Sequence, residues 1–195
     1  MKESKRIGWI RHGRTEWNAL GKIQGQTDIP LNEEGIRQAR ALAERLAADG
    51  MHWDGVVSSH LSRARETARI IAEKLEIPLL EPDERLQERY FGEIEGTTEQ
   101  ERISRWGEQW RQTYEGQESD ELVRARGFGF LKDWLLQEGM NNLLVVSHGS
   151  FLSQMVHALC DNLDKSYIGN MSFSIMDYNE GRWQSALHNC MRHLD

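Results

Sequence analysis

The stretch IGWIRHG, residues 7–13, joins a short apolar run to an arginine, a histidine and a glycine. Two later stretches have the same form, VVSS at 56–59 and LLVVSHG at 143–149. Short continuous apolar runs are typical of strands that are buried on both faces of a largely parallel sheet. Ligands of such sheets bind beyond the carboxyl ends of the strands. The polar residues that follow the three runs are therefore expected to meet at one site.

The longer segments between these runs have the apolar spacing of helices. Helices are predicted over residues 32–50, 64–75, 122–137 and 150–159. Near the end of the chain, SFSIMDY at 172–178 and RWQSAL at 182–187 flank a turn and predict a hairpin. Alternating strands and helices predict an α/β fold, a three-layer sandwich with a largely parallel central sheet flanked by helices.

The chain of 195 residues is long enough for one domain, and we assign the whole range 1–195 to it. Residues 96–119 are polar and carry Trp106 and Trp110, and we interpret them as an inserted helix and loop that act as a lid. Two roles stay open for the aromatic residues of this segment, which include Tyr114. Either these residues line an apolar wall for a bulky leaving group, or they pack the helix onto the domain.

The net charge of −7 and the lack of any Lys/Arg tract argue against nucleic acid as a partner. No apolar run reaches the roughly 20 residues that a membrane-spanning helix needs. The first residues, MKESKR, contain no apolar leader. We therefore expect a cytoplasmic protein with no membrane partner. Cys160 and Cys190 have no metal-binding spacing and are expected to be reduced thiols.

The histidine at the end of the first predicted strand has two interpretations. A lone histidine is usually a surface residue or a satisfied core residue. A neutral imidazole among arginines, by contrast, can attack a phosphoryl group and form a phosphohistidine. The second interpretation is favoured at His12, because Arg11 adjoins it and guanidinium groups match phosphate oxygens with paired hydrogen bonds.

Several stretches of the chain resemble, in the same order, the motifs of the histidine phosphatase superfamily, which also contains the cofactor-dependent phosphoglycerate mutases. They are RHGRTEWN at 11–18, SSHLSRARETA at 58–68, LQERYFGEIEG at 86–96 and VVSHG at 145–149. A further stretch, GQTDIPLNEEGIRQA at 25–39, is similar to the broad-specificity phosphatase branch of that family. The resemblance covers most of the chain and implies a phosphoglycerate mutase-like fold.

The resemblance also implies roles for individual residues. His12 matches the nucleophile of the family, and Arg11 and Arg63 match its phosphate-binding arginines. His148 matches a histidine that donates to the phosphoryl oxygens. Glu88 matches the acid that protonates the leaving alkoxide and then activates a water. To act as an acid it has to hold a proton near neutral pH, through burial or through the charge of the bound phosphate.

The rest of the expected phosphate-binding set consists of Gly13, Asn18 and Gln24. For Asn18, holding the nucleophile loop and touching phosphate stay equally open. Arg14 and His60 depart from the family's usual residues and are expected outside the site. The remaining histidines lack metal-ligand spacing and no Gly-rich phosphate loop is present, so no metal and no cofactor are expected.

The expected function is metal-independent hydrolysis of a phosphomonoester through a phosphohistidine on His12, with Glu88 as general acid and base. The expected partner is a small phosphorylated metabolite; neither its identity nor the oligomeric state can be read from the sequence. One alternative is a phosphoglycerate mutase, which returns the phosphoryl group to a second hydroxyl. The other is a non-catalytic module that binds a phospholigand. The short chain and the ERYFGEIEG form of the acid motif resemble the phosphatase branch.

Overall fold

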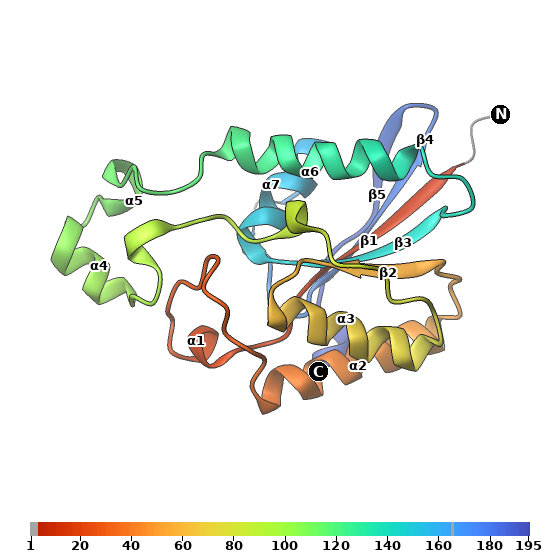
Figure 1. Cartoon of the computed structure of the whole chain (residues 1–195), viewed down its shortest axis with the longest axis horizontal. Helices are drawn as coiled ribbons and strands as arrows, with labels where there is room; N and C mark the ends of the chain where they lie inside the picture. Colours follow the sequence, from red (N-terminus) through yellow and green to blue (C-terminus); the bar gives the residue numbers. More distant parts are fainter. Residues whose placement is uncertain (1–3, 165) are drawn as a thin grey trace.

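A single mixed sheet forms the centre of the computed structural model, which describes residues 4–164 and 166–195 (Figure 1). Its strands are β1 (Lys5–Arg11), β2 (Gly55–Ser58), β3 (Asn142–Ser147), β4 (Phe173–Asn179) and β5 (Arg182–Cys190), in the order β2-β3-β1-β4-β5. The first three strands run parallel, and the hairpin of β4 and β5 adds an antiparallel edge. The predicted strands, the predicted hairpin and the largely parallel sheet are thus confirmed.

Helices cover both faces of the sheet (Figure 1). The helices α2 (Glu33–Asp49) and α3 (Ser62–Leu75) pack together on one face, and α6 (Asp120–Leu135) and α7 (Gly149–Leu159) pack together on the other. The shorter elements are α1 (Glu16–Ala19), α4 (Glu99–Trp106), α5 (Trp110–Thr113), η1 (Glu84–Leu86), η2 (Gly92–Ile94) and η3 (Arg192–Leu194). The predicted three-layer α/β sandwich is confirmed.

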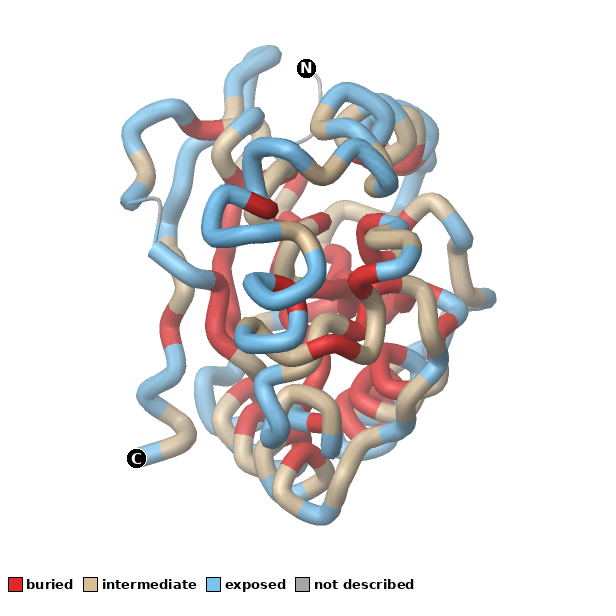
Figure 2. Tube along the Cα trace, turned by 90° about the vertical axis from the view of Figure 1, so that its left-hand side faces the viewer, coloured by how far each residue is buried: buried red, intermediate tan, exposed pale blue. Residues whose placement is uncertain are grey.

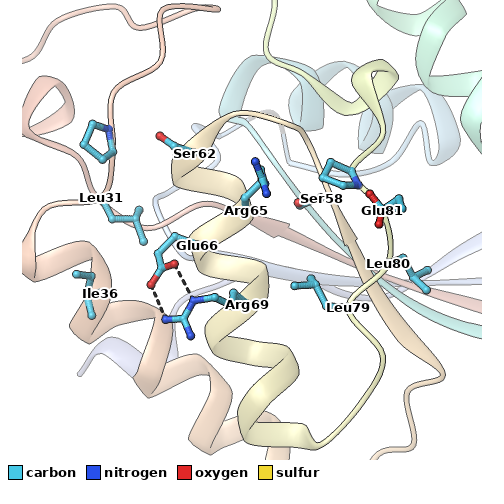
Figure 3. Close-up of a pocket in the computed structure, with 12 residues that line it drawn as sticks. Leu31, Ile36, Ser58, Ser62, Arg65, Glu66, Arg69, Leu79, Leu80 and Glu81 are labelled. Atoms are coloured by element: carbon cyan, nitrogen blue, oxygen red, sulfur yellow. Dashed lines mark hydrogen bonds and ion pairs between the residues drawn. The ribbon is translucent and has the colours of Figure 1, made fainter.

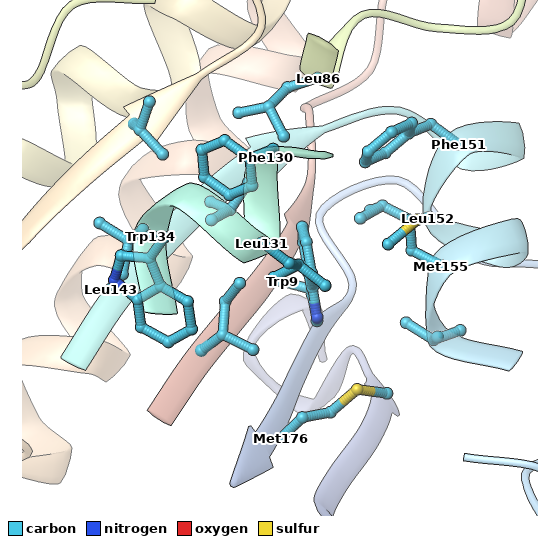
Figure 4. Close-up of a cluster of buried hydrophobic side chains, with 14 of the residues drawn as sticks. Trp9, Leu86, Phe130, Leu131, Trp134, Leu143, Phe151, Leu152, Met155 and Met176 are labelled. Atoms are coloured by element: carbon cyan, nitrogen blue, oxygen red, sulfur yellow. The ribbon is translucent and has the colours of Figure 1, made fainter. Parts of the chain in front are cut away.

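Each face of the sheet has its own apolar core, because side chains alternate between the faces of a strand. On β1, Ile7 and Trp9 pack towards α6 and α7, while Ile10 packs towards α2 and α3. Figure 4 shows the first of these clusters around Trp9 and Trp134. On the same face as Ile10, Gly8 leaves room for neighbouring side chains, since a Cβ there would lie 2.6 Å from Leu144. Buried chain fills the interior of the molecule and exposed turns surround it (Figure 2).

The ends of the predicted helices follow the capping residues. The Asn32 side chain accepts a hydrogen bond from the Gly35 amide at the start of α2, and Gly50 ends that helix with a left-handed φ of 63°. The prediction for α6 was wrong at both ends by two residues. Its start is set by Ser119, whose side chain caps Leu122, and its last helical residue is Leu135.

Residues 96–119 leave the sandwich and extend beyond the carboxyl ends of the parallel strands (Figure 1). The segment forms two short helices, α4 and α5, separated at Gly107, which has a φ of 84°. Trp110 is buried and donates its indole N–H to Glu99. Trp106 and Tyr114 form an edge-on pair with ring centroids 5.6 Å apart. The Tyr114 hydroxyl also accepts from the Glu93 amide at 2.8 Å, which ties the segment to the chain before it.

Two simpler expectations can be compared with the structure. Cys160 and Cys190 are buried and unpaired, as expected for reduced thiols. Across the described parts of the chain, the apolar helices are all too short to cross a membrane.

Candidate active site

The carboxyl ends of the three parallel strands lie side by side, so that three distant parts of the chain meet. Arg11, the last residue of β1, is in register with Ser147, the last residue of β3. Beyond this pair, the backbone N–H of His12 donates to the Ser147 carbonyl at 3.0 Å. A cavity of about 380 Å³ opens at this edge. Six of the predicted site residues line it: Arg11, His12, Asn18, Gln24, Arg63 and Glu88.

His12 is held as a neutral imidazole that carries its lone pair on Nε2. Its side chain is 2 % exposed, and Nδ1 lies 2.7 Å from the carbonyl oxygen of Gly13. Because a carbonyl only accepts, we assign the proton to Nδ1, which leaves the lone pair on Nε2. Burial, followed by the charges of Arg63 and Arg11, holds the pKa of His12 well below its usual range. The imidazole is therefore in the form that a nucleophile requires.

Arg63 brings a buried positive charge directly to that nitrogen. It lies in the first turn of α3, is fully buried, and its Nε lies 3.3 Å from Nε2 of His12. The other guanidinium nitrogens donate to the carbonyls of Thr27 and Gly25. Burial lowers the pKa of Arg63 to about 10, so the group is still charged at neutral pH. A phosphoryl group at Nε2 would thus meet a fixed cation.

His148 lies beside His12, with the two ring centroids 5.1 Å apart. It is completely buried, and within the described residues neither ring nitrogen has a hydrogen-bond partner. Burial, followed by the charge of Arg63, lowers the pKa of His148 well below its usual range. A buried imidazole without partners is costly unless a ligand supplies them. The His148 ring does not line the cavity of about 380 Å³. A phosphoryl group bound in that cavity would therefore reach the ring from the side of His12.

The two buried histidines predict a loss of stability in acid. In the unfolded chain a histidine takes up a proton near pH 6.5, whereas His12 and His148 stay neutral in the folded protein until a much lower pH. Below about pH 6.5 the unfolded state binds more protons, so the free energy of unfolding falls as the pH falls. Replacing His148 by glutamine should reduce this slope by up to about 1.4 kcal/mol per pH unit.

Urea unfolding of the wild type and of His148→Gln, at several pH values between about 6.5 and 5, measures the difference between the two slopes. His60→Gln is the matched control, because His60 is exposed. Equal slopes for the wild type and His148→Gln would contradict the prediction.

Glu88 is fixed by backbone amides at the start of α7. Its Oε1 accepts from Arg89 N and Phe151 N, and its Oε2 accepts from Ser150 N, at 2.8 to 3.0 Å. These three donors fix the position of both carboxyl oxygens.

The neighbouring carboxylates have other positions. Glu93 is exposed, and Glu95 accepts from the amides of Gln26, Thr27 and Phe91. Glu95 therefore ties the loop at 26–27 to the acid motif. Of these three carboxylates, Glu88 is the one whose side chain lines the cavity.

The remaining predicted residues divide into two groups. Asn18 and Gln24 line the cavity. Both are also held by Thr15: the Oδ1 of Asn18 accepts from the Thr15 amide, and the Oε1 of Gln24 accepts from the Thr15 hydroxyl. Gly13 packs against the backbone of α2, where a Cβ would lie 2.5 Å from the Gly35 carbonyl oxygen. This close packing leaves no room for a side chain at position 13.

Arg14 and His60 are both exposed, as expected for residues outside the site. Sequence reasoning missed several residues that line the cavity: Lys22, Ile23, Phe91, Ser150, Ser153, Gln154, Ser166, Tyr167 and Ile168. Most of them lie in α7 and in the segment after it, where no motif or period marks individual positions. Trp106, Trp110 and Tyr114 are absent from the lining residues.

A second cavity, of about 610 Å³, lies apart from this chemistry. Leu31, Ile36 and Leu79 give it apolar walls, and Glu66 on its rim is paired with Arg69 (Figure 3). None of the predicted site residues lines it. Over the described residues, no three or more His, Cys, Asp or Glu side chains are placed to hold a metal ion.

Comparisons with known proteins agree with the motifs. The family described as histidine phosphatase superfamily (branch 1) matches residues 7–191. The phosphatase PhoE of Bacillus subtilis is 34% identical over 188 residues, which cover 95% of this chain and 94% of PhoE. A 2,3-bisphosphoglycerate-dependent phosphoglycerate mutase of Methylobacterium is 36% identical over 161 residues, which cover 76% of this chain and 77% of the mutase.

Solved structures give the same result for the fold. YhfR of Bacillus stearothermophilus has a TM-score of 0.85 and 27% identity, with 97% of this chain and 99% of YhfR covered. A mycobacterial glucosyl-3-phosphoglycerate phosphatase has a TM-score of 0.83 and 26% identity, with 95% of this chain and 99% of that protein covered. The phosphoglycerate mutase-like fold implied by the sequence is confirmed.

Proposed function

The chain belongs to the histidine phosphatase superfamily and is an enzyme of its phosphatase type, and on this premise we propose that it hydrolyses phosphomonoesters through a phosphohistidine on His12. The observation that carries this proposal is the state of the imidazole. Nε2 of His12 carries a lone pair and accepts from Nε of Arg63 at 3.3 Å, and the side chain lines the cavity together with Glu88.

In the first step, the Nε2 lone pair attacks phosphorus, and the bond between phosphorus and the ester oxygen breaks. Glu88 donates its proton to the leaving oxygen, so that an alcohol leaves and a carboxylate remains. Arg11, Arg63 and His148 hydrogen-bond the phosphoryl oxygens and stabilise their charge in the transition state. These protein groups supply the positive charge and the donors, which supports a reaction that needs no metal ion.

In the second step, the Glu88 carboxylate accepts a proton from water, and the water oxygen attacks phosphorus. The bond between phosphorus and Nε2 breaks, and the imidazole regains its free lone pair. Inorganic phosphate is released, and Glu88 is again protonated for the next cycle. The amides of Ser150 and Phe151 support this step, because they hold the carboxyl oxygens of Glu88 in place.

A second candidate activity of the same site is phosphoryl transfer to another hydroxyl. It is favoured by the mutases among the relatives, which reach 36% identity. A mutase differs from a phosphatase in the acceptor that reaches the phosphohistidine, so the two activities separate by their products. Release of inorganic phosphate equal to the alcohol formed indicates hydrolysis, and release of alcohol without inorganic phosphate indicates transfer.

The proposal predicts that the purified protein hydrolyses p-nitrophenyl phosphate in the presence of a chelator. The expected result is unchanged turnover after chelation, because arginine and histidine groups bind the phosphoryl oxygens. Vanadate should inhibit competitively, since it adopts the geometry of the transferred phosphoryl group. Release of p-nitrophenol and of inorganic phosphate measures both results. Loss of turnover on chelation, or indifference to vanadate, would overturn the mechanism.

A further inference from the structure

The segment between α7 and β4 surrounds Arg11 on several sides. The Arg11 backbone N–H donates to the Ser172 carbonyl at 3.2 Å, and the Arg11 carbonyl accepts from Met171 N at 3.2 Å. The side chain is held by the same segment. Its Nη1 donates to the hydroxyl of Tyr167 at 2.5 Å and to the carbonyl of Ile168 at 2.6 Å.

These two contacts leave one edge of the guanidinium for a ligand. Nη1 carries two hydrogens, and Tyr167 and Ile168 accept both of them. The opposite edge consists of Nε and Nη2. Nε is buried and has no hydrogen-bond partner among the described residues. Two donors on one edge match two oxygens of a phosphoryl group, so the orientation of Arg11 decides whether this paired contact forms.

Tyr167 contacts Arg11 in a second way and is itself held in place. Its ring lies 4.9 Å from the guanidinium carbon, while 74% of the residue is exposed. Behind it, the Asn189 side chain donates to the Tyr167 carbonyl at 2.9 Å and accepts from Gly169 N at 3.2 Å. A residue so exposed contributes little to the core. Its hydroxyl and ring are instead directed to one buried arginine of the site.

We propose that Tyr167 is a positioning residue for phosphate binding, which acts by fixing the Nε and Nη2 edge of Arg11 towards the phosphoryl group. The inference rests on the proposed function in one respect, namely that Arg11 binds the phosphoryl oxygens. Because Tyr167 acts through Arg11, its effect concerns the phosphoryl group and is independent of the leaving group.

The test compares Tyr167→Phe, which keeps the ring and removes the hydroxyl, with the wild type. The KM, the inhibition constant of vanadate and the dissociation constant of inorganic phosphate should each rise about tenfold, because one hydrogen bond to a charged group is lost. The kcat should change by less than about threefold, since the loosened contact binds substrate and transition state alike. An aryl phosphate and an alkyl phosphate should show the same rise.

Two further variants make the result specific. Tyr178→Phe is the matched control, because Tyr178 lies on β4 against Trp183 and should leave all constants unchanged. In an Arg11→Lys background, Tyr167→Phe should have almost no additional effect on phosphate binding, because the group through which it acts is gone. Thermal unfolding checks that each variant is folded.

Unchanged phosphate binding in Tyr167→Phe would overturn the inference. A rise in KM for one leaving group only would overturn it as well, because Tyr167 would then contact the leaving group. Phosphate binding needs no turnover, which separates this test from that of the proposed function. A wild type that binds phosphate without hydrolysing esters would refute the proposed function alone, and one that binds neither phosphate nor vanadate would refute both.

Discussion

Replacing His12 by alanine is expected to reduce kcat by a factor on the order of 10⁴ to 10⁶, because the covalent route to hydrolysis is then lost. In the proposed mechanism, the imidazole both accepts the phosphoryl group and releases it. The arginines that remain can still bind the ester, so the KM should change far less than kcat. The loss should be the same for every substrate, since it concerns the atom that attacks phosphorus.

The direct measurement is a trapped phosphoenzyme. Rapid denaturation in base during turnover of a ³²P-labelled ester should leave an acid-labile label on the wild type and none on His12→Ala. His60→Ala is the matched control, because His60 belongs to the second motif but is exposed. It should retain both turnover and label. A His12→Ala protein with more than about one hundredth of wild-type turnover would exclude His12 as the nucleophile.

The position of His12, the proposed nucleophile, could be predicted from the sequence because it depends on the ends of buried strands. Apolar runs identify such strands, and a parallel sheet brings their carboxyl ends to one edge whatever the length of the connections. His12 and His148 each follow such a run, and Ser59 and Arg63 follow the third. The meeting of these segments follows from the topology and needs no knowledge of side-chain contacts.

The environment of Arg11 could not be predicted in this way. Tyr167 and Ile168 lie in irregular chain, where neither apolar period nor capping residues indicate which atoms face the site. Their contacts with Nη1 depend on how the chain returns from α7 to β4 across the end of β1. The same holds for Glu95, which is close to Glu88 in the motif but binds the loop at 26–27. The motif at 86–96 contains three carboxylates, and their tertiary packing distinguishes them.

Arg11 and Arg63 act electrostatically on the two buried histidines, His12 and His148. Burial keeps both imidazoles neutral, and the charges of Arg63 and Arg11 add to this effect. A neutral His12 is a nucleophile, and a neutral His148 still has one N–H to donate. A bound phosphoryl group would partner the unpaired nitrogens and offset the cationic charge at once. The site is therefore electrostatically prepared for an anion.

The second large effect is expected for Glu88→Gln, and its form depends on the leaving group. An alkyl phosphate leaves as a poor alkoxide, so without the acid kcat should fall by a factor of about 10² to 10⁴. p-Nitrophenolate leaves without a proton, so the first step with that ester should be nearly normal. The second step still lacks its base, because an amide does not accept the proton of water.

With p-nitrophenyl phosphate, Glu88→Gln should therefore show a burst of p-nitrophenol, close to one equivalent of enzyme, followed by slow turnover. The burst arises because the phosphohistidine forms faster than water removes it. Stopped-flow absorbance measures its amplitude. Glu93→Gln is the matched control, since Glu93 is exposed and should give neither the burst nor the slow phase. If alkyl and aryl phosphates lost activity equally and no burst appeared, Glu88 would serve to hold the start of α7 through Ser150 and Phe151, and the acid and base would have to be another group.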